Sequence, residues 1–218
     1  MQFGKAFTYV FEDDDWIMKT IIAALVSLIP IIGQITVVGW GLEVTRRVIR
    51  QEEQVLPDWS DFGGHIVKGI VTWVIGLVYA LPIILVWICP VIIIAAVPEE
   101  DTVVSLVSVC FGCLTFLYVI LLLFVLPAAL GNYAAKDEIG AAFRFGEVFG
   151  LVRAAPGAYL LTILGALIAG VIISPLGIIL CFVGVLWTQA YAVLINSHLW
   201  GQAYNEAQKV EVLEPVEV

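Results

Sequence analysis

The stretch "SLIPIIGQITVVGW", residues 27–40, decides how this chain is threaded. It lies in an apolar run between Lys19 and Glu43, and it places Pro30 and Gly33 in the middle of that run. Proline removes a backbone donor and glycine accepts conformations closed to other residues, so together they favour a turn. The stretch leaves two alternatives, a chain that turns back here and a chain that crosses a membrane once.

The composition of the whole chain indicates a lipid environment. Its 218 residues are 61% hydrophobic and 13% charged, with a mean hydropathy of +1.04, which is more apolar surface than one soluble core hides. The uncharged run 154–205 would, as one helix, exceed twice the ~30 Å thickness of the hydrocarbon layer, so it must cross and return. A barrel needs alternating polar and apolar residues, which these runs lack. We therefore predict an all-α integral membrane protein.

Charges and turn residues divide the chain into about six apolar segments. We place them at 17–30, 33–49, 66–96, 102–131, 156–174 and 176–202. Taken in pairs they form three helical hairpins, 17–49, 66–131 and 156–202, within one membrane domain, and an acidic tail follows at 206–218. Arms of ~14 residues reach only ~21 Å, so the first hairpin is expected to be short or re-entrant.

Proline and glycine mark the expected turns and irregularities. Pro30 and Gly33 are the structural turn of the first hairpin, and Pro175 and Gly177 are that of the last. The segment 66–96 contains two internal prolines and is expected to tilt, kink or break near its far end.

The basic residues favour the turn over the single crossing. If the first and last pairs turn back, all ten Lys and Arg residues fall on one side of the membrane, which the positive-inside rule makes cytoplasmic, together with both termini. A straight crossing at Pro30 would instead place Lys5 and Lys19 on the other side.

The net charge of −9 limits the classes of molecule that this chain is expected to bind. The chain has nineteen acidic and ten basic residues. This excess of acidic residues argues against nucleic acid as a partner and against binding to anionic lipid headgroups through a cluster of basic residues. The run "EDDDW", residues 12–16, offers carboxylates for a divalent cation, but the favoured interpretation is that they complement the N-terminus of the first helix. Trp16 and Trp59 are expected to be interface anchors at the headgroups.

Catalytic signatures are weak in this sequence. Glu43 is the deepest acid, and an i,i+4 pair with Arg47 accounts for it. Cys110 and Cys113 have the C-x-x-C spacing of a thiol–disulfide exchanger, but cysteine is also a common small apolar residue in buried helices, which is the interpretation we favour. We predict no enzyme activity, no cofactor and no metal site.

The last apolar segment is the most polar. Gln189 and Asn196 are seven residues apart and share a helix face, while His198 and Gln202 are one turn apart. Such side chains form interhelical hydrogen bonds or line a polar path, and we favour the hydrogen bonds.

Small residues recur four apart in three places. The pairs Gly76 with Ala80, Gly146 with Gly150, and Ala166 with Gly170 are typical of helices whose backbones approach closely. We expect them to support a compact bundle and self-association.

Four stretches carry a resemblance to a known family. They are "FTYVFEDDDWIMKTIIAALVSLIPIIGQITVVGW", "LPDWSDFGGHIVKGI", "LPAALGNYAAKDEIGAAF" and "HLWGQAY". Together they resemble the prokaryotic membrane proteins of domain-of-unknown-function family 4013. The resemblance implies a bacterial or archaeal inner-membrane protein, and it transfers no activity and no functional residue.

Three functional hypotheses follow. The leading one is a non-enzymatic membrane subunit or scaffold that acts through helix packing, with a second copy or another membrane protein as its partner in the bilayer. The alternative is a small transporter or channel with a polar path along the last helix. The weakest is a thiol-redox protein that uses Cys110 and Cys113.

Overall fold

The computed structural model describes residues 1–96 and 101–213, and within them the chain is helical, with turns and no strand. The side chains of 96, 101, 180–183 and 211–213 are outside this description. The helices are α1 (Lys5–Thr8), η1 (Tyr9–Glu12), α2 (Trp16–Val26), α3 (Ile32–Ile49), α4 (Phe62–Ala96), α5 (Asp101–Lys136), η2 (Ile139–Phe143), α6 (Phe145–Ala154), α7 (Pro156–Leu167), η3 (Ile168–Ile173), α8 (Ser174–Leu176), η4 (Gly177–Leu180) and α9 (Cys181–Leu213).

Among the residues that the structure describes, three helical stretches are long and apolar enough to cross a membrane. They are Phe62–Ala95, Thr102–Lys136 and Pro156–Ile179. The first helix of the first hairpin, α2, has 11 residues and is about 17 Å long, which is less than the hydrocarbon thickness. The membrane-spanning helices are therefore supported, whereas the expected count of six spans is not confirmed.

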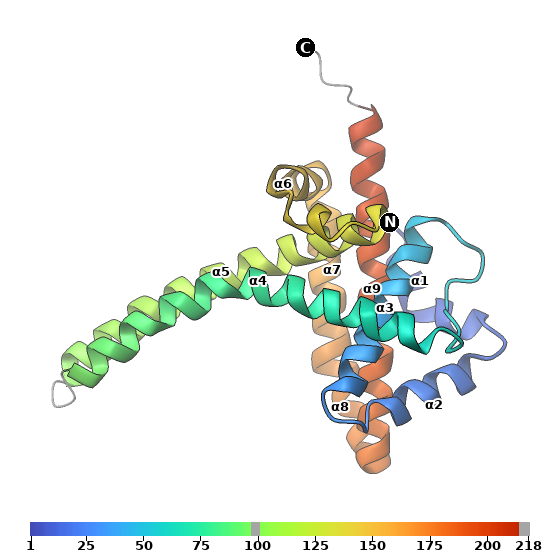
Figure 1. Ribbon diagram of the computed structural model, residues 1–218, viewed down its shortest axis with the longest axis horizontal. Helices are drawn as coiled ribbons and strands as arrows, with labels where there is room; N and C mark the ends of the chain where they lie inside the picture. Colours follow the sequence, from blue (N-terminus) through green and yellow to red (C-terminus); the bar gives the residue numbers. More distant parts are fainter. Residues whose placement is uncertain (97–100, 214–218) are drawn as a thin grey trace.

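The long helices form pairs that diverge from a common centre (Figure 1). Helices α4 and α5 lie side by side and extend away from the rest, while α7 packs along α9 in another direction. Between these pairs lies α3, which packs against both α4 and α9. One group of buried residues joins α4, α5, α6, α7 and α9, a second lies around α3, and the far ends of the pairs separate.

The chain turns back at residues 27–31 and does not continue as one straight helix. The N–H of Ile32 donates to the Pro30 carbonyl over 2.7 Å, and Ile31 has a φ of 65°, a costly conformation for a β-branched residue. A Cβ at Gly33 would lie 1.9 Å from the carbonyl oxygen of Val26. Glycine at this position thus lets α3 begin in contact with the end of α2.

The turn of the last hairpin lies against α9. A Cβ at Gly177 would lie 2.4 Å from the carbonyl oxygen of Gly184. The hydroxyl of Thr188 on α9 donates to the carbonyl of Ser174 over 2.8 Å, and Pro175 lies inside the short helix α8. The turn expected at Pro175 and Gly177 is therefore built from short helical segments closed by contacts with α9.

Two long helices differ from expectation in their extent. Helix α4 runs through Pro82 and Pro90 without a break, so of the three outcomes expected for this segment the break does not occur within the described residues. Helix α9 continues to Leu213, so residues 206–213 of the expected acidic tail are helical. Residues 214–218 of that tail lie outside the described residues.

Two long helices approach each other closely where α3 crosses α4. A Cβ at Gly39 would lie 1.9 Å from the carbonyl oxygen of His65, and a Cβ at Gly69 would lie 1.9 Å from that of Ile35. The two backbones touch here, so neither position has room for a larger residue.

The small-residue pairs expected from spacing do not mark such contacts. A Cβ at any of the glycines in those pairs meets nothing within 4 Å, namely Gly76, Gly146, Gly150 and Gly170. The prediction that these glycines bring helices of the same chain together is wrong.

Candidate functional site

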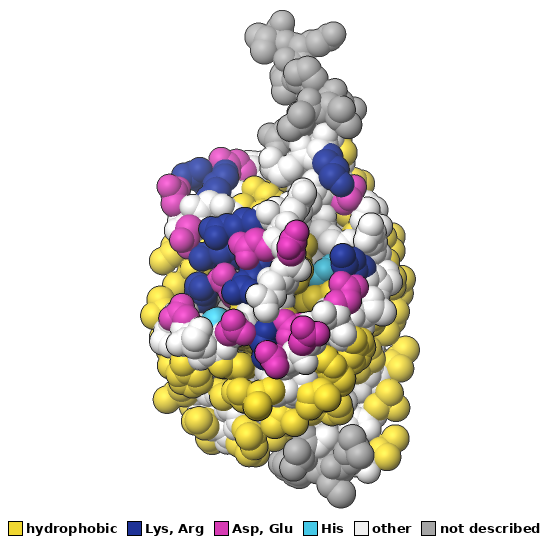
Figure 2. Space-filling view, turned by 90° about the vertical axis from the view of Figure 1, so that its right-hand side faces the viewer, with side chains coloured by type: hydrophobic (Ala, Val, Ile, Leu, Met, Phe, Trp, Pro, Cys, Tyr) yellow, Lys and Arg dark blue, Asp and Glu magenta, His cyan; other side chains and the backbone are white. Residues whose placement is uncertain are grey.

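Charged side chains gather on one part of the molecule, which Figure 2 shows above a surface of hydrophobic side chains. We call this region the charged end and define it by residues 5–19, 43–68 and 136–153, which hold most of the ion pairs. It includes the connection 50–61 between α3 and α4. Polar chemistry in this chain is concentrated here.

The connection 50–61 is tied to α2 and α3 by two tryptophans. The fully buried Trp40 donates from Nε1 to the carbonyl of Pro57 over 3.0 Å, and its ring stacks on Trp59 with centroids 4.9 Å apart. Trp59 is half-buried and donates to the carbonyl of Lys19 over 2.9 Å. The predicted membrane anchor Trp59 is therefore used to hold the chain together.

The same connection holds a buried cation and a buried imidazole. Lys19 is 5% exposed, and its Nζ lies 2.8 Å from Asp13 and 2.9 Å from Asp58. Burial acts to raise the pKa of Asp13, but hydrogen bonds from Lys19 and from the N–H of Asp15 outweigh it, and the pKa is lowered. His65 lies with Nε2 3.0 Å from the carbonyl oxygen of Asp58.

A second ionic cluster joins α3, α4 and the end of α5. Glu43 lies 3.8 Å from Arg47, so the expected i,i+4 pair is present. Its shortest contact, however, is 2.6 Å to the Nζ of Lys68 on α4, which sequence spacing could not reveal. The buried Arg46 pairs with Asp137, directly after α5. These contacts fix three helices relative to one another.

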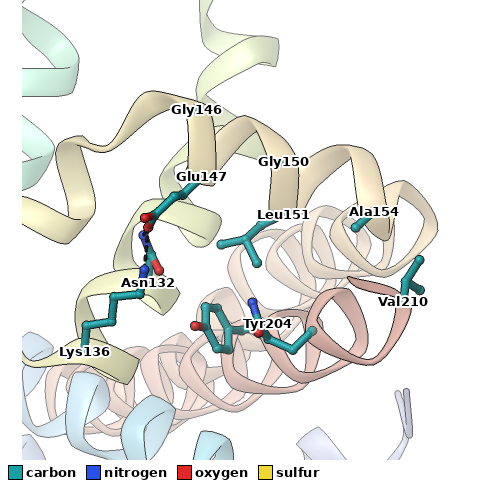
Figure 3. A pocket seen from close by; sticks show the side chains of 10 residues that line it. Asn132, Lys136, Gly146, Glu147, Gly150, Leu151, Ala154, Tyr204 and Val210 are labelled. Atoms are coloured by element: carbon teal, nitrogen blue, oxygen red, sulfur yellow. Dashed lines mark hydrogen bonds and ion pairs between the residues drawn. The ribbon is translucent and has the colours of Figure 1, made fainter. Parts of the chain in front are cut away.

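A cavity of about 610 Å³ lies between α5, α6 and α9 (Figure 3). At one side Asn132, which is 2% exposed, donates to Glu147 over 2.9 Å, and Lys136 pairs with the same carboxylate. The hydrogen bonds from Lys136 and Asn132 lower the pKa of Glu147 to about 2. Leu151 and Ala154 give the cavity an apolar wall. Its size and mixed lining suit ligand binding.

Two of the predicted polar residues of α9 lie together. His198 is buried and stacks on Tyr9 with ring centroids 4.3 Å apart, and its Nδ1 lies 2.8 Å from Nε2 of Gln202. Gln202 also exchanges hydrogen bonds with the backbone of Gln2. These residues join the N-terminal segment to α9.

The other two predicted polar residues of α9 have no hydrogen-bond partner in the described part of the chain. Gln189 is exposed, and Asn196 is half-buried with its Oδ1 covered. Among the residues that the structure describes, their amides therefore form none of the expected interhelical hydrogen bonds.

The remaining predicted positions lie apart from these clusters. Trp16 is half-buried, with Phe11 edge-on at 4.9 Å and Trp187 stacked at 6.4 Å. Cys110 and Cys113 are exposed on α5 and carry free thiols. Across residues 1–96 and 101–213, no group of three or more His, Cys, Asp and Glu side chains is arranged to hold a metal ion.

Sequence reasoning missed Trp40 and Asn132 as central residues. Each of them lies inside a long apolar run. A single amide or indole among aliphatic residues indicates a buried polar group, and buried polar groups are usually hydrogen-bonded to another group of the chain. The partners themselves, Pro57 and Glu147, could not be read from spacing.

Of the comparisons with known proteins, only the comparison with family models gives a match. No curated protein and no solved structure matches the chain. A family model described as "Protein of unknown function (DUF4013)" matches residues 22–182, which is most of the chain and includes α3, α4, α5 and α7. The chain therefore belongs to the DUF4013 family.

Proposed function

We propose that this protein is a non-enzymatic subunit or scaffold of the cell membrane that acts by packing its helices against other membrane helices. The observation that carries the proposal is the openness of its apolar helices. Only 11%, 6% and 22% of the most apolar stretches of Phe62–Ala95, Thr102–Lys136 and Pro156–Ile179 are buried within the chain. Helices this open offer long flanks to partners of the same chemistry.

The arrangement of the charged end supports a structural role. The buried charged groups Lys19 and Arg46 both have acidic partners, and those contacts join separate helices. A charge that is buried and paired in this way positions the chain and is not available to a substrate. The charged end thus acts as a rigid base from which the helical pairs extend.

The proposed orientation places the charged end and both termini in the cytoplasm. The turn residues 27–31 and 174–180, remote from that end, contain no Lys or Arg, which agrees with the positive-inside rule. In a variant without the native cysteines, a membrane-impermeant maleimide applied to sealed right-side-out vesicles should then label a cysteine placed at Thr102, in the first turn of α5, and spare one placed at Arg50.

The test of the proposed function is the composition of the particle that surrounds the chain in its own membrane. Extraction with a membrane-solubilising polymer, without detergent, followed by mass measurement should give a discrete assembly of more than one chain. A population of single chains that also forms no crosslinked product with an apolar photo-crosslinker would contradict the proposal.

A small transporter or channel is the second candidate, and the unpartnered amides of Gln189 and Asn196 favour it, because polar groups at depth also mark solute paths. Liposomes that contain the protein would then pass K⁺ or glycerol faster than empty ones. Replacing both residues by Leu should abolish that flux. Equal permeability of loaded and empty liposomes to both probes would remove this candidate.

A further inference from the structure

The cavity between α5, α6 and α9 lies next to the ends of two candidate membrane spans. Its lining includes Lys136, the last residue of Thr102–Lys136, and Ala154, which comes two residues before Pro156–Ile179. The chain therefore leaves the bilayer on one side of the cavity and enters it again on the other. Lipid headgroups are the molecules that surround the protein at this level.

The connection 137–155 between these two spans has exposed apolar side chains. Ile139 is 49% exposed and Phe145 is 53% exposed, and Arg144 beside Phe145 is exposed as well. Exposed apolar side chains next to basic ones are typical of a segment that lies in the interface of a bilayer. This feature supports the same membrane level independently of the length of the spans.

The lining of the cavity has a polar end and an apolar end (Figure 3). At the polar end Lys136 on α5 pairs with Glu147 on α6. Ala154 is seven residues, or ~10 Å, further along α6, and it forms the apolar end together with Leu151. A ligand that fits both ends has a charged head and an apolar body.

The polar end can bind a cation and an anion side by side. The ammonium of Lys136 has three donors, and its ion-pair partner among the described residues is Glu147, so two donors are available to phosphate oxygens. Oε2 of Glu147 accepts from Asn132 and Lys136. Its Oε1 has a 3.5 Å contact with Arg144 and can accept a hydrogen bond from a ligand ammonium. A head with one positive and one negative group matches this pair, whereas Glu147 repels a head that is only anionic.

Two glycines of α6 leave space for a ligand. Gly146 and Gly150 line the cavity one turn apart, and a Cβ at either position would meet nothing within 4 Å. A ligand can therefore lie directly against the backbone of α6.

We propose that this cavity binds the head of phosphatidylethanolamine, with the ammonium on Glu147, the phosphate on Lys136 and the start of an acyl chain beside Leu151. The cavity volume of about 610 Å³ lies within the ~300–1,000 Å³ of small-ligand pockets, so it holds the head and the glycerol of the lipid. This inference does not depend on the proposed function, because a bound lipid is compatible with a scaffold and with a transporter.

The first experiment compares lipids on the intact chain. Protein in detergent is titrated with phosphatidylethanolamine, phosphatidylcholine or phosphatidylglycerol of identical acyl chains, and bound lipid is counted by native mass spectrometry. Phosphatidylethanolamine should bind about tenfold more tightly than phosphatidylcholine, whose trimethylated head donates no hydrogen bond, and more tightly than the anionic phosphatidylglycerol. Glu147→Gln keeps an acceptor for Asn132 and Lys136, and it should remove the preference for the ethanolamine head.

The second experiment fills the cavity. Gly150→Leu places a side chain in the space for the lipid and should weaken binding of phosphatidylethanolamine about tenfold or more. The matched control is Gly76→Leu on α4, where a Cβ also meets nothing within 4 Å and which lies outside the lining. Both variants should keep the helix content and unfolding temperature of wild type, so a loss of binding is not a loss of fold.

A photoreactive lipid reports where the head lies. Phosphatidylethanolamine with a diazirine near the glycerol end of one acyl chain should crosslink to α6 or α9 in wild type and in Gly76→Leu. Peptide mapping of Gly150→Leu should show these crosslinks reduced.

Three results would overturn the proposal. If the three lipids bind equally and Gly150→Leu changes nothing, the bound lipid is the ordinary layer around the helices. If phosphatidylglycerol binds more tightly than phosphatidylethanolamine, the pair of Lys136 and Glu147 does not select a zwitterionic head. If glycerophosphoethanolamine, which has the head without acyl chains, binds as tightly as the lipid, the cavity takes a soluble ligand. None of these results bears on the proposed function, which is tested by the number of chains in the particle.

Discussion

The charged end and the α4–α5 hairpin of this protein are held together in opposite ways. At the charged end Leu56 is 2% exposed and Lys19 is 5% exposed, and the ammonium of Lys19 meets the carboxylates of Asp13 and Asp58. Along the hairpin, Leu85 and Leu117 are 59% and 63% exposed. The chain stabilises its charged end by its own contacts, and it leaves the hairpin to be covered by lipid or by other helices.

This difference predicts where a substitution should change the free energy of unfolding most. A substitution at the charged end breaks contacts that no lipid can replace, whereas an apolar substitution on the hairpin exchanges one lipid-facing group for another. Four comparisons of unfolding, each in the same detergent or bicelle, test this division.

The largest effect is expected where α3 and α4 touch. Gly69→Ala should destabilise the fold by about 3 kcal/mol or more, because its Cβ would lie 1.9 Å from the Ile35 carbonyl oxygen and the helices must move apart. The matched control is Gly76→Ala on the same helix, where a Cβ meets nothing within 4 Å. Alanine is the better helix former, so this variant should gain up to about 1 kcal/mol in thermal unfolding. Equal losses in the two variants would contradict the crossing.

The next effect concerns the tryptophan that holds the connection 50–61. Trp40→Phe should cost about 2 kcal/mol, because the Pro57 carbonyl loses its donor and a small void is left. Trp73→Phe on α4 changes a side chain that is 55% exposed and should stay within about 0.5 kcal/mol of wild type. The comparison fails if denaturant unfolding shows the two substitutions to be equivalent.

A smaller effect depends on pH. The pKa of Asp13 is lower in the folded chain than in the unfolded one, so its stabilisation is present above the unfolded value of about 3.9 and is lost as pH falls through the folded value. We expect about 1 kcal/mol, because Lys19 keeps Asp58 as a second partner. Asp13→Asn should remove this part of the dependence when unfolding is measured from pH 6 to pH 3. An unchanged profile would exclude the pair.

The smallest effect is expected at Asn196. Its Oδ1 is buried without a partner, so Asn196→Leu removes an unsatisfied acceptor and should change stability by less than about 0.5 kcal/mol or raise it slightly. A loss of more than 1 kcal/mol in thermal unfolding would mean that this amide has a partner in the membrane. Thr45→Val is the control. The Thr45 hydroxyl donates to the Ser197 carbonyl over 2.9 Å, so loss of this hydrogen bond should lower the stability of the fold.

Sequence patterns predicted the helices and the turns of this chain well, and they predicted the contacts between helices poorly. The apolar runs placed helices close to α3, α4, α5 and α7, and the turn expected at Pro30 is where the chain reverses. The glycines of the small-residue pairs did not mark contacts within the chain, because spacing along one helix shows which face they share and not what lies opposite; the self-association that the pairs also predict stays a prediction. The crossing at Gly39 and Gly69 joins residues from two helices, so no single-helix pattern contains it.

The candidate site was predictable to a similar degree. The pair of Glu43 with Arg47 is local and was expected, while its shorter contact with Lys68 depends on how α3 and α4 are rotated. Asn132 and Glu147 meet at one side of a cavity that forms only when α6 folds back over α5. Interactions within one helical turn follow from the sequence, and those between elements require the packed chain.

By itself the sequence determined that this protein is made of membrane helices, where they run and where the chain turns. Those properties depend on the length of apolar runs and on proline and glycine, which act locally. Only the tertiary structure decided that the helical pairs diverge from a common centre, that Trp59 donates a hydrogen bond to the Lys19 carbonyl, and that Gln189 meets no partner among the described residues. These features depend on the direction and rotation of each helix, which composition does not encode.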